Sequence, residues 1–253
     1  MRLSGSLLLK VVAAGGACLL FGVVMVTIPR HTLSLEYQRS LGDGSLATLL
    51  ASNDEATSAR AALAIGRTKL HGGIPLLEAR LRDPRAPVRA LSVYSLGLIN
   101  AGSDAGTIAG FAVHDTSGAV RVAALDALGR YESSRKMGSA AEARAEKVSV
   151  WALDHDDSPI VRGRAAIGLN FFADGPRGPA AALSLVSAMR AEKVNAVRER
   201  IMWTVFRRYA ARVPRAFLAA HLRDSDEVVR IEAARAFGRL KDPAAVATLE
   251  PSL

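Results

Sequence analysis

The chain contains very little cysteine and very little lysine. Cys18 is the only cysteine among its 253 residues, so redox usage excludes neither an oxidising nor a reducing compartment. Only six of the 33 basic residues are lysine, although the formal net charge is +9. Genomic base composition can produce such an arginine bias. The net charge alone therefore does not predict a nucleic-acid partner, although clustered arginines can neutralise phosphates.

Residue patterns that carry catalysis are also missing. No glycine-rich phosphate loop follows a strand, and no strand pattern is evident, so a nucleotide site has no support. There is no His-Glu pair for a metal, and no Ser or Cys nucleophile has a base that can be named. We therefore expect no catalytic residue, no metal ligand and no cofactor, and we predict that the chain is not an enzyme.

What the chain does contain is a repeated five-residue pattern. An acidic residue is followed after six positions by Arg, which usually has Val just before it, and seven positions later by an apolar residue and then Gly. The clearest copy runs from Asp83 to Gly97, and the pattern returns from Asp115 to Gly129. The arginine position of this pattern recurs, with Ser in the first copy, at Ser58, Arg89, Arg121, Arg162, Arg198 and Arg230. These positions differ by 31, 32, 41, 36 and 32, a range of periods typical of helical solenoids.

Each copy places its apolar residues on one helical stripe. In the third copy Val120, Ala124 and Leu128 are spaced for one face of an amphipathic helix. Such units cannot bury their apolar faces alone, so we expect them to stack. The Gly after the last apolar residue suits either a helix end or a close helix crossing. The sequence predicts an all-α fold, an α-solenoid of about six helical-hairpin repeats.

The motif Asp-x4-Val-Arg-x2-Ala-x3-Leu-Gly, seen from Asp115 to Gly129, resembles the HEAT-repeat family, in particular its short branch first noted in bilin lyases. The resemblance covers residues 45 to 250 and implies that each repeat is a pair of antiparallel helices. It also implies that acid and arginine hydrogen-bond between adjacent repeats, as a structural ladder. The ladder residues would be Asp83, Arg89, Asp115, Arg121, Asp156, Arg162, Asp224 and Arg230.

The resemblance does not extend to the HEAT-like iron hydroxylases, because their His-Glu metal ligands are missing here. His114 and His155 each precede a ladder acid, at equivalent positions of adjacent repeats. Packed helices alone lie 8–10 Å apart. The two imidazoles are therefore expected to lie too far apart to share a metal, and we interpret them as exposed turn residues.

A second strong feature is an uncharged run at residues 11–28, which is long enough to span a bilayer about 30 Å thick. We predict an uncleaved transmembrane anchor at 1–29, a tether at 30–45 and a repeat domain at 46–253. A cleaved signal peptide and a lipoprotein modified at Cys18 remain alternatives. Flanking charges favour a single-pass membrane protein whose solenoid lies outside the cytoplasm, in the periplasm for a bacterial chain.

The repeat pattern breaks most in the fifth copy. Ile201 replaces the small residue there and Phe206 replaces Gly, within a run rich in arginine and aromatic residues. Arginine and aromatic residues together are typical of interface hot spots. The candidate partner-binding residues are Arg198, Arg200, Trp203, Arg207, Arg208 and Arg212. The alternatives are a solvated helix face, or local core for Trp203 and Phe206.

These observations favour a membrane-anchored, non-catalytic scaffold for protein–protein interaction, which could be an accessory subunit of a membrane complex. Its expected partners are a membrane-associated protein and, through residues 11–28, the lipid bilayer. A HEAT-like lyase-type enzyme subunit and a nucleic-acid-binding HEAT-like protein remain as alternatives. Fold-level resemblance does not decide among them, because function resides in sites on the fold.

Overall fold

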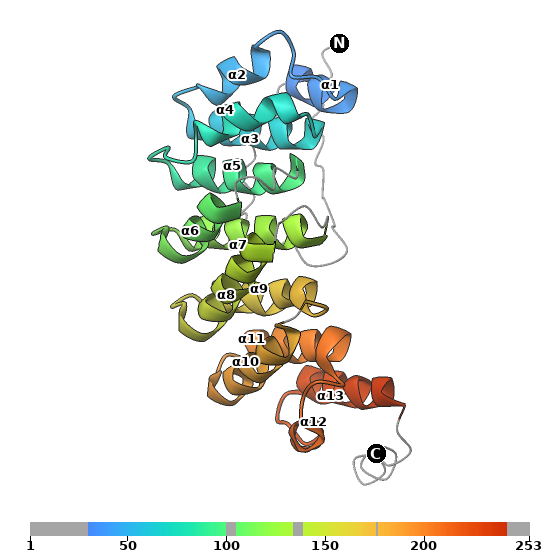
Figure 1. Ribbon diagram of the computed structural model, residues 1–253. Coiled ribbons are helices and arrows are strands. Elements are labelled where there is room, and N and C mark those ends of the chain that lie inside the picture. Colours follow the sequence, from blue (N-terminus) through green and yellow to red (C-terminus); the bar gives the residue numbers. More distant parts are fainter. Residues whose placement is uncertain (1–29, 100–104, 134–138, 176, 242–253) are drawn as a thin grey trace, which may run out of the picture.

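The computed structural model describes residues 30–99, 105–133, 139–175 and 177–241. In these residues all regular structure is helical, and Figure 1 shows the helices following one another along a stack from α1 to α13. Six helix pairs make up the stack. The first helices of the pairs are α2 (Ser45–Leu50), α4 (Ile74–Glu78), α6 (Ala105–His114), α8 (Ser139–His155), α10 (Gly178–Ala191) and α12 (Arg215–His221).

The second helices pack against one another in chain order and form one layer of the solenoid. They are α3 (Glu55–Thr68), α5 (Ala86–Ile99), α7 (Gly118–Ser133), α9 (Pro159–Gly168), α11 (Asn195–Thr204) and α13 (Glu227–Leu240). Short turns of other helix types extend the pairs: the 3₁₀ helices η1 (His71–Gly73) and η3 (Leu169–Phe172), and a π-helical turn, η4 (Val205–Tyr209). The predicted α-solenoid is therefore the observed fold.

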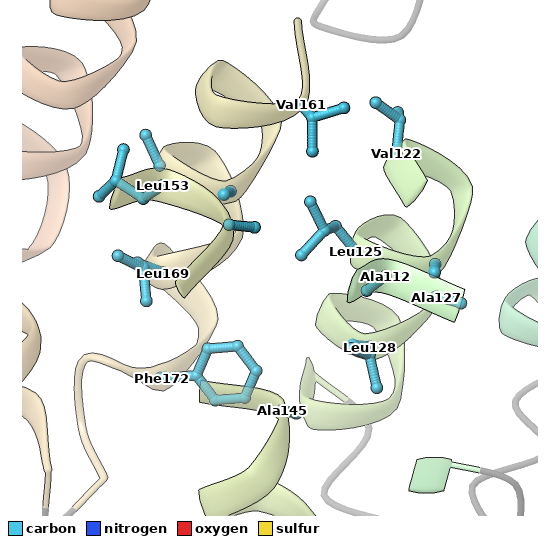
Figure 2. Close-up of a cluster of buried hydrophobic side chains, with 14 of the residues drawn as sticks. Ala112, Val122, Leu125, Ala127, Leu128, Ala145, Leu153, Val161, Leu169 and Phe172 are labelled. Carbon is cyan, nitrogen blue, oxygen red and sulfur yellow. The ribbon is translucent and has the colours of Figure 1, made fainter. Parts of the chain in front are cut away.

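The core runs between the two layers. Figure 2 shows Leu125 and Leu128 of α7 facing Leu169 and Phe172 of the following repeat, all with at most 2% of their surface exposed. Many of the smaller core residues are alanine, so neighbouring helices approach closely. Because α5, α7, α9 and α11 each lie between the second helices of the adjacent repeats, these repeats rely on their neighbours to cover their apolar faces.

The repeated glycine marks a close helix crossing. A Cβ added at Gly97 would lie 2.7 Å from the backbone of Ala127, and one at Gly66 would lie 2.4 Å from the Ser95 side chain. The fifth repeat has Phe206 at this position. The chain there winds as the π-helical turn η4, and the phenyl ring stays half-buried at the surface instead of entering the crossing.

The segment predicted as a tether is partly helical. Residues Arg30–Gln38 form α1, which packs on α3. Its Leu35 is buried, and its Glu36 forms ion pairs with Arg60 and Arg67. Apolar burial and two ion pairs hold this segment against the first repeat.

The predicted membrane anchor at residues 1–29 lies outside the described residues. Over the parts of the chain that the structure describes, every helix is too short or too polar to cross a bilayer. The predicted single-pass membrane location is corrected accordingly.

Candidate interaction surface

Arginine side chains link successive repeats at the starts of the second helices. Arg89 donates two hydrogen bonds to Asp115, both 2.9 Å long, and its Nη1 donates to the Asp83 carbonyl at 2.9 Å. Arg121 and Arg162 likewise bind the backbone of their own repeat as well as the acid of the next. The cross-repeat pairs are Arg89–Asp115, Arg121–Asp156, Arg162–Glu192 and Arg198–Asp224, which we call the ladder.

Two of the ladder acids, Asp156 and Glu192, are held ionised by their hydrogen bonds. Burial alone would raise the pKa of Asp156, but hydrogen bonds from Arg121 and from the Ser158 N–H outweigh it and lower the pKa below its ordinary value. The pKa of Glu192 is lowered in the same way by Arg162. A hydrogen bond to Asp156 also raises the pKa of Arg121, so both partners remain charged.

The first repeat has no ladder arginine, and another residue takes its place. Arg85 donates to both carboxylate oxygens of Asp83 at 2.8 Å, and its Nη1 donates to the Ser52 carbonyl at 2.9 Å. Arg85 therefore links the first two repeats, since the first repeat has Ser58 and not arginine at the ladder position. At the other end Arg230 donates to the backbone carbonyls of its own repeat, Asp224 and Ser225.

One side of each second helix forms a surface that runs along the solenoid. It consists of the residues two, five and nine positions after the ladder position, and we call it the second-helix face. In the fourth repeat these are Arg164, Ile167 and Phe171, and in the fifth they are Arg200, Trp203 and Arg207. The ninth position is exposed in every repeat but the second. Neighbouring repeats touch on this face, since the Arg130 guanidinium lies 5.1 Å from the centre of the Tyr94 ring.

The predicted partner-binding residues do not all lie on one exposed surface. Arg198 belongs to the ladder, where its side chain is only 16% exposed and pairs with Asp224, so its assignment to a free binding surface is corrected. Arg200 and Trp203 are half-buried on the second-helix face. Arg207 lies 5.5 Å from the centre of the Trp203 ring.

The remaining two candidates lie at the edge of this group. Arg208 forms an exposed ion pair with Asp174. The Nη1 of Arg212 donates to the Arg208 carbonyl at 3.0 Å, so its side chain folds back on its own segment. Of the candidate residues, Trp203, Arg207 and Arg208 line one pocket.

This pocket has a volume of about 200 Å³ and lies between the fourth and fifth repeats. Its aromatic wall includes Phe171, which is 44% exposed, and Trp203. Asn170 donates to Thr204 Oγ1 at 3.0 Å across the repeat junction, while its own Oδ1 has no hydrogen-bond partner in the described residues. The full lining is Ile167, Asn170, Phe171, Trp203, Arg207 and Arg208.

Sequence reasoning missed the contribution of the fourth repeat to this pocket. Ile167 stands five positions and Phe171 nine positions after Arg162, which are the offsets of Trp203 and Arg207 in the fifth repeat. Comparing equivalent offsets in adjacent repeats would have found both residues. A local cluster of arginine and aromatic residues in the sequence does not reveal Ile167 and Phe171, because the two halves of the pocket are more than thirty residues apart in the chain.

Metal-ligating side chains do not gather anywhere in the part of the chain that the structure describes, where no group of three or more His, Cys, Asp or Glu could hold an ion. His155 stacks on Trp151, with ring centres 5.6 Å apart, and its Nδ1 lies 3.1 Å from the Trp151 carbonyl oxygen. This histidine therefore packs within its own helix, α8.

No protein-family model and no curated protein matches the chain. Among solved structures, the chain is similar to YibA, a HEAT-like all-helical repeat protein. YibA from Escherichia coli matches with a TM-score of 0.63 and 19% identity, over 86% of this chain and 78% of its own. An engineered protein matches with a TM-score of 0.54 and 18% identity, over 88% and 67%. At these identities the likeness shows the fold alone.

Human deoxyhypusine hydroxylase, solved in complex with glycerol, matches with a TM-score of 0.37 and 20% identity, over 88% of this chain and 82% of its own. That neighbour is an enzyme, so the prediction that the chain is not an enzyme is corrected: a repeat fold of this kind does not exclude catalysis. The match is too weak to assign any activity to this chain.

Proposed function

We propose that this chain is an interaction scaffold of HEAT-like repeats that binds a protein partner through the second-helix face of its fourth and fifth repeats. The observation that carries the proposal is the pocket in which the exposed aromatic ring of Phe171 and the indole of Trp203 lie beside Arg207 and Arg208. Aromatic residues and arginine anchor protein interfaces, because they bury a large area and still form polar contacts.

The distribution of charge favours a protein partner over a nucleic acid. Acidic residues are interleaved with the arginines of the second-helix face and neutralise several of them: Arg164 pairs with Asp126, and Arg235 pairs with Glu232. Affinity for a phosphate backbone grows with the number of phosphates that arginine and lysine neutralise, and an arginine already paired with a carboxylate contributes less. A protein segment needs only a few charges placed beside apolar contacts.

The test is quantitative affinity capture of the full chain from its native cells. The site variant reverses two charges, Arg207→Glu with Arg208→Glu. Its matched control reverses the same number of charges at two exposed turn residues, Arg82→Glu with Arg223→Glu. We expect the wild type and the control to retain a protein in amounts comparable to the chain itself, and the site variant to lose it.

Two results would count against this function. One is that no protein is recovered in comparable amounts with the wild type. The other is that the site variant and the control retain the same protein equally well. Far-ultraviolet circular dichroism of both variants must match the wild type, so that loss of capture cannot come from loss of the fold.

A further inference from the structure

The pocket between the fourth and fifth repeats lies where both second helices depart from regular α-helical winding. Asn170 and Phe171 belong to the 3₁₀ helix η3, while Arg207 and Arg208 belong to the π-helical turn η4. Single π-helical turns within helices are frequent at functional sites. The local winding of the chain thus points to a binding role for this junction.

Three side-chain hydrogen bonds hold the two walls of the pocket in place. Asn170 donates to Thr204 at 3.0 Å, and Thr204 donates to the Ala166 carbonyl at 2.9 Å. The Tyr209 hydroxyl donates to the Leu169 carbonyl at 2.7 Å. All three bonds join the fourth repeat to the fifth, and Thr204 and Tyr209 are fully buried. The pocket is therefore formed before a ligand arrives, which lowers the cost of binding.

The size of the pocket suits one large side chain. Its volume is about 200 Å³. Sites for small-molecule ligands and cofactors are larger, roughly 300–1,000 Å³. A cavity of roughly 150 Å³ is large enough to hold one benzene molecule. A single ring from a partner protein therefore fits this pocket.

The lining does not suit an acidic group. Its apolar walls include Phe171 and Trp203, which would remove water from a carboxylate without replacing the lost hydrogen bonds. Arg208 is already paired with Asp174. The Arg207 guanidinium carbon lies 5.5 Å from the centre of the Trp203 ring, so this cation already rests on an aromatic face. A ligand that contacts both the rings and the guanidinium groups matches this lining better than a carboxylate does.

We infer that the pocket binds one aromatic side chain of the protein partner, a phenylalanine or tyrosine ring. This inference rests on the proposed function and names the anchor residue of the partner. The ring packs against Trp203 and against Phe171, which is 44% exposed. The negative face of the ring attracts the Arg207 guanidinium. An aliphatic side chain gains neither the ring contacts nor the attraction to the cation.

The experiment adds short peptides to the full chain and follows the tryptophan indole N–H signals by nuclear magnetic resonance. The probe is Gly-Gly-Phe-Gly-Gly with both ends blocked, and two comparison peptides carry Leu or Glu in place of Phe. The chain has two tryptophans, which provide an internal comparison: Trp203 lines the pocket, while Trp151 lies on α8.

We expect the Phe peptide to shift the Trp203 signal saturably, with little change at Trp151. The Leu peptide should bind at least about threefold more weakly, and the Glu peptide should not bind. Phe171→Ala should weaken binding of the Phe peptide at least about tenfold, as loss of a central aromatic contact does. Tyr37→Ala is the matched control, because it removes a ring that is 92% exposed on α1, and it should leave the affinity unchanged.

A second variant, Arg207→Gln, tests the cation separately from the rings. It should weaken binding of the Phe peptide about threefold and leave binding of the Leu peptide nearly unchanged. The Phe171 ring also packs against Gly129 of α7, whereas Arg207 is exposed, so this variant tests the pocket with little risk to the fold. Far-ultraviolet circular dichroism of each variant must match the wild type.

The inference is overturned if the Phe peptide leaves the Trp203 signal unchanged, or if the Leu peptide binds equally well. It is also overturned if the Glu peptide binds more tightly than the Phe peptide, or if Arg207→Gln weakens the Phe and Leu peptides equally. Affinity capture separates this failure from failure of the proposed function. A captured protein that is lost with the charge reversals but retained in full by Phe171→Ala would keep the scaffold and exclude the aromatic anchor.

Discussion

At the scale of single residues, the side chain of one ladder arginine, Arg121, has two roles. Arg121 fixes the start of its own helix by donating to the Asp115 carbonyl at 2.9 Å, and it fixes the next repeat by donating to Asp156 at 2.7 and 2.8 Å. Asp156 in turn accepts the Ser158 N–H at 2.9 Å, at the start of α9. One ion pair therefore sets both the spacing of two repeats and the start of a helix.

Removing the charge of Asp156 tests this role. Asp156→Asn keeps the shape of the side chain but leaves the largely buried Arg121 without its main counter-charge, so we expect a loss of about 2–4 kcal/mol of unfolding free energy at pH 7. Urea unfolding followed by circular dichroism measures it. Asp157→Asn is the control, because Asp157 also pairs with Arg121 but its side chain is 90% exposed; its cost should be near zero.

The same variant has a distinct pH profile. The pKa of Asp156 is lower in the folded chain than in the unfolded chain, so its contribution to stability is complete above about pH 4 and is lost as the pH falls through the folded pKa. Asp156→Asn should therefore lose less stability than the wild type between pH 5 and about pH 2. Parallel profiles for the two proteins would show that Asp156 does not titrate with folding.

At the scale of elements, the glycine that follows the last apolar residue of four second helices is required only where the next helix crosses closely. Gly97→Ala should cost about 1–3 kcal/mol, because the new methyl group would meet the Ala127 backbone at 2.7 Å. Gly238→Ala, at the same position of the last repeat, has nothing within 4 Å and should stabilise α13 by about 0.5–1 kcal/mol. Thermal unfolding of both variants measures the contrast; equal shifts would refute the crossing argument.

The sequence allowed much of this element structure to be predicted. The spacing of Val120, Ala124 and Leu128 identifies a helix face, and the period of the motif predicts the stack. What it could not supply was the partners of residues outside the clear copies of the motif. Arg198 stands in a basic run, so composition grouped it with Arg207, whereas its ion pair with Asp224 can be seen only after folding. Glu36 looked like part of a tether for the same reason, since its partners Arg60 and Arg67 lie in another helix.

At the scale of the whole molecule, the stack has no single core that unites its ends. Each second helix packs on its neighbours, and among the described residues α13 has only one second helix beside it. At the α11–α13 junction Phe206 takes the glycine position, and its ring lies against Arg239, 4.7 Å from ring centre to guanidinium carbon. Stability in such an array is close to a sum of local terms, so we expect the last repeat to open more readily than the middle of the stack.

Amide hydrogen exchange read by mass spectrometry tests this expectation, with two variants of equivalent ladder residues. Arg198→Gln should raise exchange in α12 and α13 several-fold and leave α5 and α7 unchanged, because it removes the ion pair to Asp224 alone. Arg89→Gln should raise exchange in α5 and α7 and leave α12 and α13 unchanged, since its partner Asp115 precedes α7. If either variant raised exchange evenly from α3 to α13, the chain would unfold as one unit. The nearest-neighbour description, and with it a last repeat that opens independently, would then be wrong.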